Sequence, residues 1–167
     1  MQSTGRRNCA LKRSPDALLL IAGEGPAARS LRAQAARLGL DGTVRFLGYF
    51  ERGGELQDCY SAADIFVFSS LTETQGLVLL EAMAQGVPVV AIPRMGTIDI
   101  LGPGLGCRHA PNDRKGFAEV VRALLADGGA RRELGVQARE YAETWASARM
   151  AQRLSALYAS LAPAVPR

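Results

Sequence analysis

The chain has 167 residues, of which 48% are apolar and 22% charged, proportions typical of a globular domain and not of a disordered or membrane-spanning chain. Its net charge of +4 comes from residues 1–15, which contain basic residues and no acid, whereas the rest of the chain has equal numbers of basic and acidic residues. This distribution excludes a nucleic-acid-binding face that extends over the domain, so no nucleic-acid partner is expected.

Residues 1–15 are interpreted as a basic N-terminal arm or the remnant of a truncated segment. The arm has no apolar run of the kind found in secretory signals. It either contacts anionic lipid or phosphate, or is simply a solvated end. Three widely spaced cysteines without a CxxC pair indicate a reduced protein with no zinc site. We therefore expect a cytoplasmic protein, with peripheral contact to the inner face of the cell membrane as one reading of the arm.

Short apolar segments alternate with helical patterns along the rest of the chain. Residues 16–22 form a short run, apolar after Asp16, that predicts a strand buried on both faces. Leu31, Ala35 and Leu38 have helical spacing and predict a helix over residues 27–38. The same patterns predict strands at residues 44–47, 65–68, 88–92 and 105–109, and helices at residues 54–62, 76–85, 98–101, 114–126, 130–142 and 144–161.

This alternation predicts right-handed βαβ crossovers and one parallel sheet with helices on both faces. Residues 16–162 form the expected domain, followed by a tail at residues 163–167. Ligands of such sheets bind at the carboxyl ends of the strands. The loops at those ends are rich in glycine or polar residues, as a binding edge requires; they are residues 23–25, 48–50, 69–76 and 93–97.

The loop before the helix at residues 76–85 contains the main candidate site. Free N–H groups at a helix N-terminus suit an anion such as phosphate, and Gly76 allows a ligand to approach the backbone. Glu73 in the loop and Glu81 inside the helix would then bind hydroxyls of an attached sugar. The residues also allow an interpretation without a binding site, in which Glu73 is a charge at the start of the helix and Glu81 faces solvent. Against it, Glu81 lies in an otherwise apolar helix and needs a partner.

Two other loops leave alternatives open. Gly23 and Gly25 form either a phosphate-binding loop or a simple strand-to-helix turn. The G-x-G-x-x-G pattern of a dinucleotide site lacks its third glycine, so an NAD-dependent oxidoreductase is disfavoured. Tyr49 and Phe50 either stack on a base or pack in the interior. His109, the only histidine, has no neighbouring acid or cysteine pattern and is expected to be structural.

The motif Glu73-x7-Glu81, followed by Ala-Met-Ala-x-Gly-x-Pro-Val-Val-Ala, resembles the signature of a glycosyltransferase family. This family comprises retaining, nucleotide-sugar-dependent enzymes of the GT-B fold, namely family GT4 or glycosyl transferases group 1. Agreement extends over residues 16–161. The resemblance implies that the chain is the C-terminal, nucleotide-sugar-binding domain, a Rossmann-like three-layer α/β/α sandwich. The loop at residues 72–77 is closer to a subgroup that includes diacylglycerol glucosyltransferases.

The resemblance also implies a role for each site residue. Glu73 would be catalytic, because it would contact donor-sugar hydroxyls and help to hold charge at the anomeric carbon. The amides of Gly76, Leu77 and Val78 would bind the diphosphate, and Glu81 the ribose. The remaining donor-binding positions, including those near the base, are Thr74, Gln75, Gly23, Gly25, Gly48, Tyr49 and Phe50.

Further expectations follow from the same family. The donor would be a nucleoside-diphosphate sugar, used as a substrate without a metal or other cofactor. The acceptor would be a glycolipid or polysaccharide precursor. GT-B enzymes have a second, N-terminal domain that builds the acceptor site, and they place cations ahead of the segment that matches residue 16. We therefore expect this chain alone to be inactive or nearly so. The alternative is a non-catalytic nucleotide-binding or protein-interaction module of the same fold.

Overall fold

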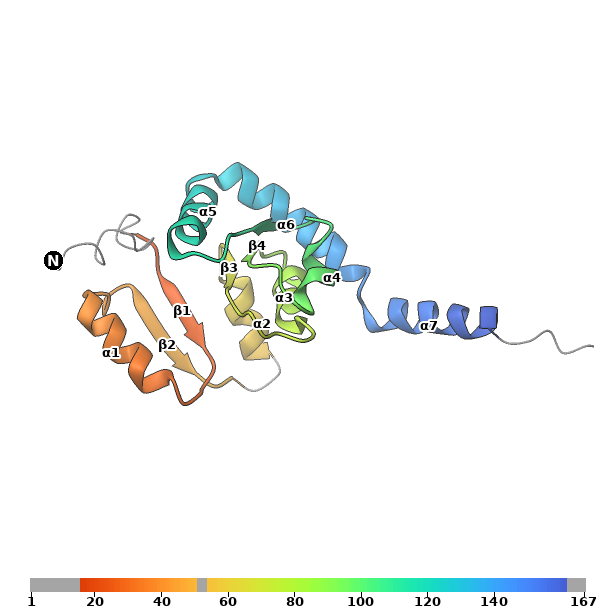
Figure 1. Cartoon of the computed structure of the whole chain (residues 1–167). Helices are drawn as coiled ribbons and strands as arrows, with labels where there is room; N and C mark the ends of the chain where they lie inside the picture. Colours follow the sequence, from red (N-terminus) through yellow and green to blue (C-terminus); the bar gives the residue numbers. More distant parts are fainter. Residues whose placement is uncertain (1–15, 51–53, 162–167) are drawn as a thin grey trace, which may run out of the picture.

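The computed structural model describes residues 16–50 and 54–161. The described strands are β1 (Leu19–Ala22), β2 (Val44–Gly48), β3 (Phe66–Phe68), β4 (Val89–Ala91) and β5 (Cys107–His109). The helices are α1 (Ala28–Leu38), α2 (Gly54–Ser61), α3 (Leu77–Ala84), α4 (Thr97–Leu101), α5 (Arg114–Ala126), α6 (Gly128–Glu143) and α7 (Ser147–Leu161). Each lies close to a segment predicted from the sequence, so the alternating α/β pattern is confirmed (Figure 1).

The strands form two parallel sheets, and the expectation of one continuous sheet is wrong. β1 pairs with β2, placing Leu19 opposite Val44. In the second sheet β4 is central, with Val90 between Val67 of β3 and Arg108 of β5. Among the described strands, β1 and β3 are therefore not paired with each other.

The three-stranded sheet carries the core, because helices cover both of its faces. Val89 and Ala91 of β4 point to one side and are fully buried in a cluster with residues of α3, α4 and α6. Val90 points to the other side, into a cluster with Leu124 of α5 and Leu134 of α6. Such two-sided cover is typical of strands in parallel sheets. It makes this half of the molecule the rigid base for the loop that follows β3.

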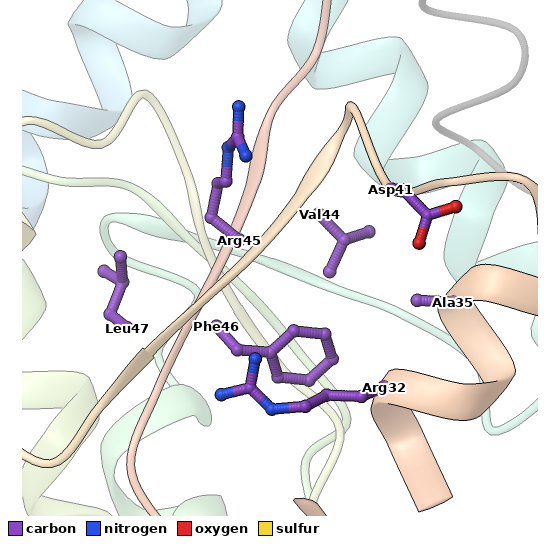
Figure 2. Close-up of a pocket in the computed structure, with 7 residues that line it drawn as sticks. All are labelled: Arg32, Ala35, Asp41, Val44, Arg45, Phe46 and Leu47. Carbon is purple, nitrogen blue, oxygen red and sulfur yellow. The ribbon is translucent and has the colours of Figure 1, made fainter. Parts of the chain in front are cut away.

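The first strand is not buried on both faces, contrary to the expectation for residues 16–22. Leu18 is 55% exposed, and no residue of β1 is fully buried. The reason is that α1 lies against one side of the two-stranded sheet, where Arg32 stacks 4.6 Å over the ring of Phe46 (Figure 2). On the other side of β2, Leu47 points away from α1 and stays 39% exposed. The β1–β2 unit therefore has little buried core of its own.

The last helix, α7, extends away from the other described elements (Figure 1). It begins at Ser147, three residues after the predicted start. Four of its large apolar side chains are more than half exposed, namely Leu154, Leu157, Tyr158 and Leu161. Within residues 16–50 and 54–161, no helix combines the length and the apolar character needed to cross a membrane.

Candidate functional site

The loop between β3 and α3 folds around the carboxylate of Glu73. Its Oε1 atom accepts hydrogen bonds from the backbone amides of Gln75 and Gly76, both at 3.0 Å. These two bonds stabilise the charged form and hold the pKa of Glu73 below its ordinary value of 4.5. No described residue hydrogen-bonds to the second oxygen, Oε2. Glu73 therefore presents an ionised carboxylate with one oxygen anchored and the other available to a ligand.

Gly76 lets the chain turn from this loop into α3. Its φ of +71° lies in the left-handed region, and an added Cβ would lie 3.1 Å from a methyl group of Ile100. The amides of Leu77 and Val78 come next, in the first turn of the helix. Among the described residues, none accepts a hydrogen bond from either amide. The start of α3 thus offers two free donors beside Glu73, whereas the Gly76 amide, also expected at the diphosphate, is engaged by Glu73.

Glu81 has the partner that its apolar surroundings require. The Tyr60 hydroxyl, at the end of α2, donates a hydrogen bond to Oε2 of Glu81 at 3.1 Å. Burial, together with the nearby Glu81 charge, raises the pKa of Tyr60, so the phenol stays protonated and acts as a donor. The Tyr60 ring packs edge-on against Phe66, with centroids 5.6 Å apart. Local spacing gave no sign of this pair, because its members are 21 positions apart.

The glycine-rich loops after β1 and β2 lie next to each other. The Gly23 amide donates a hydrogen bond to the Gly48 carbonyl at 2.7 Å, and both residues have positive φ, +114° and +80°. Gly25 begins the turn into α1, where its carbonyl accepts from the amide of Ala28. Tyr49 is 68% exposed and is therefore accessible to a ligand. These two loops therefore lie side by side at the carboxyl ends of β1 and β2.

The predicted site residues consequently form two groups. One comprises the loops after β1 and β2, and the other comprises the Glu73 loop, the start of α3 and Glu81. No hydrogen bond between the described residues joins the two groups. A separate cavity of about 400 Å³ lies between α1 and β2 (Figure 2). None of its lining residues is a predicted site residue; they are Arg32, Ala35, Asp41, Val44, Arg45, Phe46 and Leu47.

The loop after β4 contacts the Glu73 loop and supports its conformation. The sequence did not reveal this role. The Gly96 amide donates to the Glu73 carbonyl at 3.1 Å. A Cβ at position 96 would overlap the carbonyl oxygen of Thr74. Thr97 is fully buried, and its hydroxyl hydrogen-bonds to the backbone of Arg94. The only signal was the glycine itself, whose significance depends on a neighbour 22 residues away.

Two other polar side chains, Asp64 and His109, have structural partners. Asp64, which precedes β3, pairs with Arg131 of α6, with a 3.6 Å separation between Oδ1 and Nε. The His109 ring lies 2.8 Å from the carbonyl oxygen of Leu101, as expected for a structural histidine. Across the described ranges, no cluster of three or more histidine, cysteine or acidic side chains could hold a metal ion.

The lowered pKa of Glu73 predicts a specific acid sensitivity. In the unfolded chain this carboxyl titrates near 4.5, and in the folded chain it titrates below that value. Its stabilising contribution is therefore complete above pH 4.5 and is lost as pH falls through the folded pKa. We expect the melting temperature of the wild type to fall more steeply below pH 4.5 than that of Glu73→Gln, measured by circular dichroism. Parallel curves for the two proteins would contradict this assignment.

Comparison with known proteins identifies the family. The sequence profile described as glycosyl transferases group 1 matches residues 7–141. The chain belongs to this family. Among its relatives is the lipopolysaccharide core biosynthesis glycosyltransferase LpsE of Rhizobium meliloti strain 1021, 33% identical over 132 residues. The match covers 78% of this chain and 38% of LpsE, so the chain spans well under half the length of this group 1 relative.

Solved structures of glycosyltransferases show the same fold. HepE of Anabaena superposes with a TM-score of 0.79 at 23% identity, covering 90% of this chain and 43% of HepE. The C-terminal domain of the group 1 protein LpcC from Francisella tularensis has a TM-score of 0.72 at 26% identity, covering 81% of this chain and 72% of that domain. These likenesses confirm the predicted fold, the Rossmann-like C-terminal half of a GT-B glycosyltransferase.

Proposed function

We propose that this group 1 domain binds the donor of a retaining GT4 glycosyltransferase and holds a nucleoside-diphosphate sugar across the start of α3. The observation that carries the proposal is the pair of free amides, Leu77 and Val78, beside the ionised Glu73. These donors and the positive end of the helix dipole suit a diphosphate, and they stabilise it further as it leaves with negative charge. Glu81, oriented by Tyr60, is placed for the ribose hydroxyls.

The remaining assignments extend from this anchor. Oε2 of Glu73 accepts a donor-sugar hydroxyl, and its negative charge stabilises the positive charge that develops at the anomeric carbon. Thr74 and Gln75 line the same loop. The base lies along Gly48, Tyr49 and Phe50, where exposed Tyr49 offers a stacking surface. HepE, a protein of the same fold, was crystallised with UDP and with UDP-glucose, which supports a nucleotide-sugar as the ligand.

Transfer with retention follows a same-face route in this proposal. The bond from the anomeric carbon to the diphosphate breaks while the acceptor oxygen forms a bond on the same face. The acceptor proton passes to an oxygen of the leaving phosphate. Glu73 and the α3 amides stabilise the two charges that separate in this step. No metal is needed, because the helix N-terminus neutralises the leaving group.

The acceptor and the location are parts of the proposal that depend on the rest of the protein. An N-terminal GT-B domain supplies the acceptor site, so the present chain alone has little or no activity. A glycolipid or polysaccharide precursor as acceptor agrees with the role named for LpsE in lipopolysaccharide core biosynthesis. Such an acceptor places the enzyme in the cytoplasm, at the inner face of the membrane. The basic arm proposed to touch anionic lipid falls in residues 1–15, outside the described ranges.

Calorimetric titration of the chain with UDP, GDP, ADP and NAD tests donor binding. We expect one nucleoside diphosphate to bind and NAD not to bind. Replacing Glu81 by Ala should lower the affinity for the nucleotide by about tenfold to a hundredfold, because hydrogen bonds to a charged group are lost. Glu119→Ala on α5 is the matched control, since that glutamate is exposed and outside the site. Binding of NAD without any response to nucleoside diphosphates would refute the proposed function.

A further inference from the structure

We propose that Tyr60 is a positioning residue that orients the Glu81 carboxylate and thereby sets the preference for ribonucleotide over deoxyribonucleotide donors. This inference rests on the proposed function, in which Glu81 binds the ribose. It assigns to α2 a part in donor selectivity, although α2 lies outside every loop predicted to bind the donor. Its basis is the hydrogen bond from the Tyr60 hydroxyl to Oε2 of Glu81.

The position of the Tyr60 hydroxyl is held by aromatic packing. Its ring meets Phe66 edge-on, at an interplanar angle of 72°. Phe66 in turn stacks on Phe68, with centroids 6.2 Å apart. Both phenylalanines belong to β3, which is hydrogen-bonded to the buried strand β4. The hydroxyl is therefore attached to the most rigid part of the fold, and a group fixed in this way loses little freedom when a ligand binds.

Among the residues that the structure describes, Glu81 has no side-chain partner besides Tyr60. The surrounding residues of α3 are apolar, and no basic side chain in the described ranges lies within ion-pair distance of it. A glutamate side chain has several rotatable bonds, so without a partner it would have to be ordered by the ligand itself. With Oε2 bound to Tyr60, Oε1 remains free to accept from ribose hydroxyls. Preorganisation of this kind favours ligands that carry those hydroxyls.

A second side-chain contact between the same helices provides an internal control. The Ser61 hydroxyl donates to the side-chain oxygen of Gln85 at 3.2 Å. Removing this bond perturbs the contact between α2 and α3 without touching Glu81. A purely structural role of Tyr60 would make Ser61→Ala and Tyr60→Phe behave alike, whereas a positioning role separates them.

The test is calorimetry on the whole chain with a nucleoside diphosphate and its 2′,3′-dideoxy analogue. We expect Tyr60→Phe to lower the affinity for the ribonucleotide about fivefold and to leave the affinity for the dideoxy analogue unchanged, because only ribose hydroxyls bind the oriented carboxylate. Ser61→Ala should change neither. Glu81→Ala should remove the preference for ribose, and adding Tyr60→Phe to it should have no additional effect, because no acceptor for the Tyr60 hydroxyl remains at position 81. The phenylalanine keeps the ring contact with Phe66, so we expect Tyr60→Phe to fold normally. An unchanged melting curve checks this.

Each of the other possible results contradicts either the positioning role of Tyr60 or the proposed function. If Tyr60→Phe weakens the binding of both nucleotides equally, or leaves the affinity for the ribonucleotide unchanged, the positioning role is wrong. The proposed donor site is not contradicted by either result. If the effects of Tyr60→Phe and Glu81→Ala are additive, Tyr60 does not act through Glu81. If the wild type binds neither nucleotide at millimolar concentration, the proposed function itself fails and this inference falls with it.

Discussion

Replacing Glu73 by Gln should lower the rate of sugar transfer by about a hundredfold or more when this chain is joined to a group 1 N-terminal domain. The substitution removes the negative charge that the proposed function places beside the anomeric carbon, and losing one preorganised electrostatic contact typically costs a factor of about 10²–10³ in kcat. The glutamine oxygen can still accept the hydrogen bonds that Gln75 and Gly76 donate to Glu73. The loop should therefore keep its conformation, and nucleotide affinity should change little.

This experiment separates catalysis from binding. Initial rates over a range of donor concentrations give kcat and KM, and calorimetry gives the affinity for the nucleoside diphosphate. Glu133→Gln, an exposed glutamate on α6, serves as the matched control and should leave both unchanged. A Glu73→Gln protein with full activity would favour the alternative, in which the domain is a non-catalytic nucleotide-binding or protein-interaction module.

Replacing Gly96 by Ala should produce the largest structural disturbance near the site. The added methyl group would overlap the Thr74 carbonyl, and the backbone cannot yield there without moving the Glu73 loop. Overpacking of this kind costs about 3 kcal/mol, which corresponds to a melting temperature lower by about 6–12 °C. Because the Gly96 amide also holds the Glu73 carbonyl, nucleotide binding should be lost before the fold is.

Gly42→Ala is the control for the Gly96 experiment. Position 42 has no heavy atom within 4 Å of an added Cβ and does not have positive φ, so the substitution adds only a methyl group in open space. Thermal melts and nucleotide titrations of the two variants should differ clearly. Equal melting temperatures and equal affinities would show that the loop after β4 does not support the Glu73 loop.

The positions of the elements were predictable because they depend on local patterns. Apolar runs such as residues 65–68 and 88–92 are strands in any context that buries them, and they appear as β3 and β4. Glycines at the strand ends likewise marked the loops that carry Glu73 and Gly48. The family resemblance rested on the same local motifs and is confirmed by the group 1 match.

Burial was predicted less well, because it depends on what lies beside each element. The apolar run at residues 16–22 has the composition of a two-sided buried strand. Among the described strands, β1 pairs with β2 alone, and none of its residues is fully buried. The apolar positions of α7, such as Leu157, are exposed because this helix extends away from the other described elements. The sequence pattern shows which surfaces of an element are apolar. The packing of the folded chain decides which of these surfaces are buried.

The sequence by itself determined the order of strands and helices, the loops at the strand ends and the spacing of Glu73 and Glu81, since these follow from residues close together in the chain. Only the tertiary structure decided how those carboxylates are held. Glu73 is anchored by its own loop and supported by Gly96, and Glu81 is bound by Tyr60. The partners from Gly96 and Tyr60 are about 20 residues away along the chain, and folding alone brings them within hydrogen-bonding distance.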